Sequence, residues 1–173
     1  MNEFCLHCLT PSATDTCAAC GTTRLEASRG QPHCLKPGTV LGRQYLIGRV
    51  LGMGAFGVTY LGLDLKLLLK VAVKEYLPRS YASRAPDGLT VEPFSSESQS
   101  YRAHLGKFQE EGRRLARLDA HPNVVQVLGF EEAFNTGYLI MQYIEGVALS
   151  RYLEDNAGIL DDRSSAGRDV DLG

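Results

Sequence analysis

The stretch "LGMGAFGVTY", Leu51 to Tyr60, constrains the fold more than any other, because three of its glycines stand in a G-x-G-x-x-G frame. Glycines in such a frame let a backbone come close to phosphate groups. The frame alone is a weak signal, since it also opens dinucleotide-binding βαβ units, in which a helix follows the glycines. After Gly57 the chain continues with Val58 and Thr59, which favour a strand over a helix start. The stretch therefore predicts a glycine-rich β-hairpin.

A strand that carries a lysine follows this hairpin. The run "LLLKVAVKEY" contains "VAVK", which places Lys74 on a third strand. A strand, a glycine loop, a second strand and a lysine strand together indicate a hairpin that lies over a triphosphate, with the lysine reaching the α- and β-phosphates. A glycine-rich hairpin with a surface lysine is the other interpretation, and the ordered spacing favours the phosphate site.

With these motifs the sequence resembles a protein kinase N-terminal lobe, in particular that of the bacterial serine/threonine kinases, where "VAVKEYLP" has close parallels. The resemblance covers about residues 38–155 and implies an α+β fold, with a twisted antiparallel sheet of about five strands and one major helix. It also implies ATP with Mg²⁺, and transfer of the γ-phosphate to protein serine or threonine in a complete domain. In this part of the chain it assigns ATP binding to Leu51, Gly52, Gly54, Gly57, Val58, Ala72 and Lys74.

The helix after these strands should supply a glutamate. Apolar spacing predicts a helix over residues 101–118 with one apolar face. Glu111 falls on that face, three residues after Phe108, whereas Glu110 is rotated about 100° away, toward solvent. A carboxylate on a buried face needs a partner, and the resemblance implies that Glu111 pairs with Lys74 as a second catalytic residue.

Two more strands are expected around the turn "NTG". By resemblance the second, "YLIMQYI", leads into the hinge of the kinase domain. Met141 would be the gatekeeper, and the Gln142 carbonyl and the Ile144 amide would hydrogen-bond adenine through the backbone. An ordinary core strand describes these residues equally well, so the hinge role depends on their order and context.

The residues that move a phosphate are missing from the sequence. Neither "HRD" nor "DFG" occurs, so the catalytic aspartate and the family's Mg²⁺ ligands are absent. "RD" at 168–169 and "DLG" at 171–173 stand too close together to replace them. We expect a chain that stops soon after the hinge, as a fragment or a truncated product, and that is inactive alone. A missing C-terminal lobe or a partner would then cover its apolar hinge face.

Four cysteines near the N-terminus form a second motif. "CLHC" and "CAAC" give C-x₂-C-x₈-C-x₂-C, and two such knuckles can present four thiolates tetrahedrally to Zn²⁺. The predicted ligands are Cys5, Cys8, Cys17 and Cys20. His7 is an inferior alternative ligand, and a redox dithiol or inert thiols are the other interpretations. So short a segment cannot build a core, so bound metal would supply its folding free energy.

These patterns divide the chain into four parts. We expect a zinc-ribbon-like module over residues 1–21, a linker over 22–38, the kinase-like lobe with its hinge over 39–157, and a disordered tail over 158–173. The net charge of −2 argues against a dedicated nucleic-acid binder. No apolar run reaches the roughly 20 residues that span a bilayer, and no secretory signal begins the chain, so a cytoplasmic location is expected.

Two functions outside the enzyme class stay open at this point. The chain could be a catalytically inactive module that binds nucleotide or mediates zinc-dependent interactions, or it could be a remnant of a kinase gene. The protein substrate cannot be read from these residues.

Overall fold

The computed structural model describes residues 3–117, 123–147 and 152–154. The chain forms two compact units, Met1–Tyr143 and Ile144–Gly173. Every named helix and strand belongs to the first unit, which is described by itself below. The predicted tail lies outside the described residues, as does residue 118, the last of the predicted helix.

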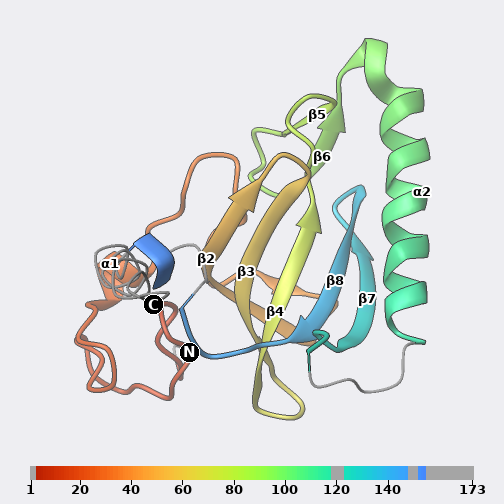
Figure 1. Cartoon of the computed structure of the whole chain (residues 1–173). Coiled ribbons are helices and arrows are strands. Elements are labelled where there is room, and N and C mark those ends of the chain that lie inside the picture. Colours follow the sequence, from red (N-terminus) through yellow and green to blue (C-terminus); the bar gives the residue numbers. More distant parts are fainter. Residues whose placement is uncertain (1–2, 118–122, 148–151, 155–173) are drawn as a thin grey trace, which may run out of the picture. The chain divides into compact units, whose positions relative to one another are not determined.

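A six-stranded antiparallel sheet of order β1-β2-β3-β4-β8-β7 forms the body of the first unit (Figure 1). Its strands are β1 Val40–Leu41, β2 Tyr45–Gly54, β3 Gly57–Asp64, β4 Leu69–Tyr76, β7 Val127–Ala133 and β8 Thr136–Gln142. The sequence predicted about five strands, and the two-residue β1 is the addition. β2 and β3 form the predicted glycine-rich hairpin, and β4 lies within the predicted lysine run "LLLKVAVKEY", because β-branched and apolar residues favour half-buried strands.

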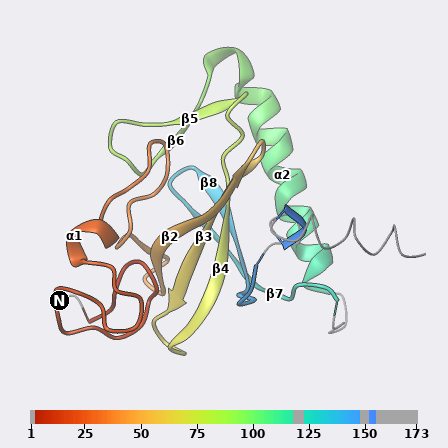
Figure 2. The same cartoon turned by 60° about the vertical axis from the view of Figure 1, so that its left-hand side comes forward.

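One long helix covers part of this sheet. Helix α2, Ser98–Leu115, packs against β7 and β8 (Figure 1, Figure 2). It begins three residues before the predicted start, following the 3₁₀ turn η1 at Ser95–Glu97. Its buried residues include Gly112, where an added Cβ would lie 2.2 Å from a methyl carbon of Leu139. Glycine therefore lets the helix approach β8 closely, which offsets the cost of glycine inside a helix.

A small hairpin lies between β4 and α2. It consists of β5 Ala82–Arg84 and β6 Val91–Pro93, paired antiparallel. Asp87 stabilises the connecting turn, since its carboxylate accepts hydrogen bonds from the backbone of Leu89 and from Thr90.

The N-terminal segment packs onto the sheet through Leu9. Leu9 is 2% exposed and lies in an apolar cluster with Leu61 and Leu63 of β3. The predicted linker after it is also packed: it contains helix α1, Arg24–Ala27, which has a Thr23 capping box, and the buried residue Leu35. Ala27, Cys34 and Leu35 of this span are therefore buried, whereas residues 28–33 are exposed.

No helix among the residues described is long and apolar enough to cross a membrane.

Candidate nucleotide site and candidate metal centre

The strand register brings the predicted phosphate lysine and the predicted adenine residues to one face of the sheet. Lys74 of β4 is paired with Thr59 of β3 and with Leu139 of β8. Ala72, two residues earlier, is paired with Met141. Directly paired residues of antiparallel strands point to the same face, and residues two apart along a strand share it. We call Thr59, Ala72, Lys74, Leu139 and Met141 the lysine face.

The glycine hairpin joins β2 and β3 at the end of the sheet nearest Lys74. A Cβ added at Gly52 or Gly54 would meet no atom within 4 Å, so both backbones have open space beside them. A Cβ added at Gly57 would lie 1.9 Å from the Glu75 carbonyl oxygen. Gly52 and Gly54 are thus free to face a ligand, whereas Gly57 lets β3 lie close to β4. Leu51, just before the hairpin, is half-buried and packs against the cluster that holds Leu9.

Val58 does not lie on the lysine face. It is paired with Glu75, is 2% exposed and belongs to the main core. Thr59 takes the place beside Lys74 that the sequence analysis gave to Val58. The alternation of faces along β3 could have predicted this place for Thr59. Gly57 is paired with Tyr76, and Tyr76 lies two residues from Lys74 and so on the same face; Thr59, two residues after Gly57, must share that face.

Lys74 is half-buried, and its ammonium points toward the helix. Its Nζ lies 6.0 Å from the centroid of the Phe108 ring on α2, at the outer limit of a cation–π contact. Glu111, one turn further along, is exposed. Within the described part of the chain Lys74 and Glu111 form no ion pair, whereas Glu110 pairs with Arg114 on the helix surface. The Lys74–Glu111 pair stays a prediction.

The position of Glu111 follows from the way α2 packs. The buried residues of the helix are Tyr101, Phe108 and Gly112. Residues 108 and 112 are four apart and define the face that meets the sheet. Glu111 precedes Gly112 and is rotated about 100° from it. The predicted face and the packed face share Phe108, and Leu105 and Leu115 also pack against the core, but Glu111 lies beside this face and is exposed.

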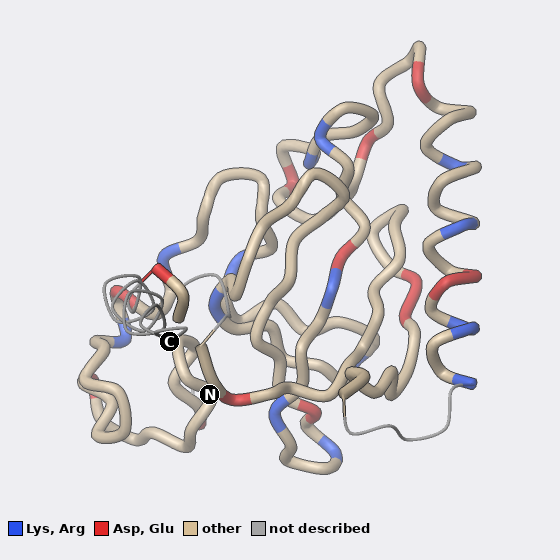
Figure 3. The backbone as a smooth tube through the Cα atoms, viewed as in Figure 1, with Lys and Arg blue, Asp and Glu red and all other residues tan. Residues whose placement is uncertain are grey.

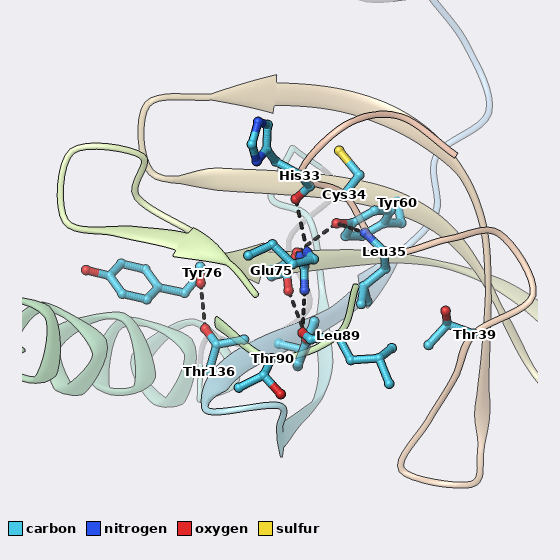
Figure 4. Close-up of polar contacts among 12 residues, drawn as sticks. His33, Cys34, Leu35, Thr39, Tyr60, Glu75, Tyr76, Leu89, Thr90 and Thr136 are labelled. Atoms are coloured by element: carbon cyan, nitrogen blue, oxygen red, sulfur yellow. Dashed lines mark hydrogen bonds and ion pairs between the residues drawn. The ribbon is translucent and has the colours of Figure 1, made fainter. Parts of the chain in front are cut away.

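The opposite face of β4 carries a closed polar cluster around Glu75, formed by Tyr60, Glu75, Arg84 and Tyr138. Figure 4 shows Glu75 and Tyr60 of this cluster. The carboxylate of Glu75 accepts hydrogen bonds from Tyr60 at 2.7 Å and from Tyr138 at 2.8 Å. Arg84 of β5 makes an ion pair with it at 2.5 Å, and the two side chains are 3% and 0% exposed. Every polar group of this glutamate cluster has a partner, as a buried charge requires.

The glutamate cluster also holds the predicted linker. The Tyr60 hydroxyl accepts a hydrogen bond from the Leu35 amide at 3.0 Å, and Arg84 donates to the carbonyl of His33 at 3.0 Å. Burial, followed by the charge of Glu75, raises the pKa of Tyr60, so this phenol stays protonated and can donate. Burial alone would lower the pKa of Arg84, but the hydrogen bond and charge of Glu75 raise it. The sequence analysis did not single out any of these contacts.

The predicted hinge residues divide between the two units. Met141 and Gln142 end β8, and the Gln142 amide donates to the Gln126 carbonyl at 2.9 Å. Met141 is half-buried on the lysine face, as a residue lining an adenine site would be. Ile144 begins the second unit, where it is exposed.

The four predicted metal ligands meet in one place. The sulfurs of Cys5, Cys8, Cys17 and Cys20 all lie within 4.8 Å of one another. The Cys5–Cys20 distance is 3.8 Å and the Cys8–Cys17 distance is 3.6 Å, and all of these cysteines are free. Four thiolates about 2.3 Å from a tetrahedral Zn²⁺ would be about 3.8 Å apart. The cluster thus fits a metal ion of this kind.

The two knuckles share one backbone pattern. The Leu9 amide donates to the Cys5 carbonyl at 2.7 Å, and the Gly21 amide donates to the Cys17 carbonyl at 2.8 Å. Both Leu9 and Gly21 have positive φ, at 55° and 72°. Glycine adopts this conformation freely, whereas leucine is strained in it. The burial of Leu9 against the sheet compensates that strain, so the first knuckle is also the docking point of the module.

Two thiols of the cluster have strongly shifted pKa values, in opposite directions. Burial raises the pKa of Cys5 to about 11. Hydrogen bonds from the side chain and the backbone of Thr22 lower the pKa of Cys20 to about 5. A bound cation would favour the thiolate at each position, so metal binding would release protons, most of all from Cys5.

Known proteins similar in sequence to the chain are protein kinases. No protein-family model matches it. It is 28% identical over 107 residues to mitogen-activated protein kinase kinase kinase 3 of Arabidopsis thaliana, covering 62% of this chain and 14% of that protein. It is 32% identical over 113 residues to serine/threonine-protein kinase PrkC of Bacillus subtilis, covering 65% of this chain and 14% of that protein. The chain thus spans a small part of these relatives.

Solved structures give the same result for the fold. The apo form of PpkA-294 has a TM-score of 0.68 at 30% identity, covering 73% of this chain and 44% of that chain. The kinase domain of Mycobacterium tuberculosis PknI has a TM-score of 0.51 at 23% identity, covering 71% of this chain and 42% of that one, a likeness in fold alone. The fold predicted from the sequence is confirmed: the chain has the fold of the N-terminal lobe of a protein kinase domain, and the relatives it matches in sequence include serine/threonine protein kinases.

Proposed function

We propose that the lysine face and the glycine hairpin bind ATP. Gly52 and Gly54 would approach the phosphates through the backbone, and Lys74 would reach the α- and β-phosphates. The observation that carries the proposal is the register, which puts Lys74 on the same face as Ala72 and Met141. Within the described part of the chain no carboxylate forms an ion pair with Lys74, so its charge is available to a phosphate.

Adenine would lie further along the same face. Leu51 and Ala72 would pack on one side of the base, with Met141 at its inner end. The Gln142 carbonyl and the Ile144 amide would hydrogen-bond it through backbone atoms. Thr59 is added to the predicted set and Val58 is left out of it, because only Thr59 shares the face of Lys74.

In a complete domain this lobe would serve transfer of the ATP γ-phosphate to serine or threonine of a protein. Bound Mg²⁺ would neutralise the phosphate charge, but its protein ligands in the family belong to motifs that this sequence lacks. Glu111 would pair with Lys74 in the active arrangement. We expect no phosphate transfer from the 173 residues alone; transfer in a kinase assay would contradict this expectation.

A titration with ATP tests the site. We expect saturable binding by the chain, and loss of most of that binding in Lys74→Met, because the positive charge opposite the phosphates is removed. Lys107→Met, on the exposed side of α2, is the matched control and should bind as the unaltered chain does. Equal affinity in Lys74→Met would rule out Lys74 as the phosphate ligand. No binding by the unaltered chain would favour the alternative, an inactive interaction module or kinase remnant.

The cysteine cluster supports a second function, Zn²⁺ binding at Cys5, Cys8, Cys17 and Cys20. The sulfur separations carry this proposal, since they match a tetrahedral thiolate site. Metal analysis after mild purification should give one zinc per chain. Cys17→Ser should lose it, whereas Cys34→Ser, at the cysteine outside the cluster, should keep it. Purified chain without metal would contradict the proposal.

We also propose that exposed apolar residues near the hinge are covered by a partner. The first unit exposes Val124 and Leu128, and the second exposes Ile144 and Val147. A C-terminal lobe or another protein that covers the hinge would bury such residues. A bacterial, cytoplasmic kinase without affinity for nucleic acid fits the sequence, and its protein substrate is not identified.

A further inference from the structure

The turn between β3 and β4, together with the first residue of β4, exposes three consecutive leucines. Leu67, Leu68 and Leu69 are 67%, 65% and 59% exposed. Lys66 and Lys70 stand on either side of them and are exposed as well. We call residues 66–70 the leucine tip. Single exposed leucines are ordinary, but three in succession on a turn form a contiguous apolar surface.

The leucine tip has a firm base. The buried Asp64 accepts hydrogen bonds from the amides of Lys66 at 2.8 Å and Leu67 at 3.1 Å through its carboxylate. Its backbone carbonyl accepts one from Leu68 at 2.7 Å. Gln44, in the neighbouring turn, donates to the other carboxylate oxygen at 2.8 Å. The tip is therefore held in one conformation, and its leucines are presented without further ordering.

One leucine of the tip combines a strained backbone conformation with an exposed side chain. Leu68 has a φ of 55°, a conformation that suits glycine or asparagine. The turn between β7 and β8 places Asn135 in this region, with a φ of 61°. Leu9 has the same φ as Leu68 but is buried, whereas Leu68 is exposed. An apolar side chain kept in a strained, exposed position suggests that the side chain itself is used.

We propose that the leucine tip inserts into the surface of an anionic lipid bilayer. Its apolar end would enter the acyl boundary while Lys66 and Lys70 meet the phosphate headgroups. Arg43, in the turn that contains Gln44, adds a third exposed cation near the base. The nearby carboxylates are Asp64, whose oxygens are taken up by hydrogen bonds, and Glu131, half-buried beside the β1–β2 turn.

A lipid surface fits this tip better than a protein does. A stable protein interface buries about 800 Å² on each partner, and one narrow turn cannot supply that area. A symmetric contact with a second copy would also bring the lysines of two tips together, which is unfavourable. Insertion into a bilayer needs only a few apolar side chains with cations beside them.

The tip also lies away from the candidate nucleotide site. β3 runs from the glycine hairpin at Gly57 to the base of the tip at Asp64, so the two turns lie at opposite ends of the strand (Figure 1). In Figure 3 the turn that projects beyond β3 and β4 carries basic (blue) positions on both sides, consistent with Lys66 and Lys70 in the sequence. Eight residues of strand separate the two turns by more than about 20 Å. A lobe bound to lipid by the tip would leave the glycine hairpin open to nucleotide.

Vesicle flotation of the whole chain tests the proposal. We expect binding to phosphatidylcholine vesicles that contain phosphatidylglycerol, weakened by salt, and much weaker binding to phosphatidylcholine alone. The triple variant Leu67→Ser, Leu68→Asn, Leu69→Ser should bind at least about tenfold more weakly, because the apolar insertion is lost. Lys66→Gln with Lys70→Gln should weaken binding about fivefold per lysine and reduce the salt effect. Leu25→Ser, at an exposed leucine of α1, is the control and should not change binding.

A spectroscopic probe keeps the test independent of these variants' folding. The chain contains no tryptophan, so Leu68→Trp gives a single indole whose emission should shift to the blue on the anionic vesicles. Leu25→Trp should not shift. No binding to anionic vesicles, equal binding to neutral ones, or no shift at position 68 would overturn the proposal. So would a dimer in solution that the triple variant dissociates, since a second copy would then be the occupant.

Discussion

Two neighbouring residues of β4 show how differently the two faces of the sheet are used. Glu75 is wholly buried, and its carboxylate is bonded to two tyrosines and an arginine. Lys74 points to the other face, is half-buried and meets an aromatic ring at the limit of contact. On one face the buried charge of Glu75 is fully hydrogen-bonded. On the other face the charge of Lys74 has space beside it.

This difference separates stability from binding. A buried ion pair whose hydrogen bonds are all satisfied fixes which segments pack together, and here it joins β4, β5, β8 and the segment around Leu35. A lysine without an acidic partner contributes little to folding but can interact with an anionic ligand. Mutations in the glutamate cluster should therefore change the stability of the fold, and mutations on the lysine face should change ligand affinity.

The largest effect should follow from Glu75→Ala. It leaves Arg84 buried without a counter-charge and two tyrosine hydroxyls without their acceptor, which should lower the free energy of unfolding by about 3–5 kcal/mol. Urea unfolding at fixed zinc concentration measures this. Glu110→Ala removes the exposed pair with Arg114 and should change stability by less than about 0.5 kcal/mol. If Glu75→Ala lowered the free energy of unfolding by less than about 1 kcal/mol, the glutamate cluster would not be the main source of stability.

A smaller loss of stability is expected at Gly57, which stands in the same glycine hairpin as Gly54. The added methyl of Gly57→Ala would collide with the Glu75 carbonyl, so β3 must move away from β4, at a cost of about 1–3 kcal/mol. Gly54→Ala meets open space and should cost less than about 0.5 kcal/mol in unfolding experiments. It should nonetheless weaken ATP binding if the Gly54 backbone approaches the phosphates. Equal destabilisation by the two variants would contradict this division of roles.

The sequence predicted the strands well because their signal is local. β3 begins at Gly57 and ends at Asp64, as its run of alternating residues indicated. Lys74, Ala72 and Met141 come together because a period of two within β4 and β8, once the strands pair, places them on one face. The cysteine cluster is local too, since each knuckle folds within a few residues and the spacing brings the pairs together.

The parts that could not be predicted depend on contacts between distant segments. No periodicity shows that Arg84 reaches Glu75 or that Leu35 binds the Tyr60 hydroxyl. For the same reason the sequence did not show that Leu35, within the predicted linker, packs into the main core. The position of Glu111 depends on Gly112, whose contact with Leu139 sets the rotation of α2; that contact cannot be read from helical spacing.

The smallest stability effect among these predictions separates Val58 from Thr59 and tests the face assignment itself. Val58→Thr puts a hydroxyl into the core beside Glu75 and should cost about 1–2 kcal/mol in urea unfolding, with ATP affinity unchanged in whatever fraction is folded. Thr59→Val, on the lysine face, should leave stability within about 0.5 kcal/mol and change ATP affinity, because its side chain would lie against the nucleotide. The two variants exchange the same two residue types at adjacent positions, so a reversed result, with affinity lost at Val58 and stability lost at Thr59, would mean that the register of β3 against β4 is shifted by one residue.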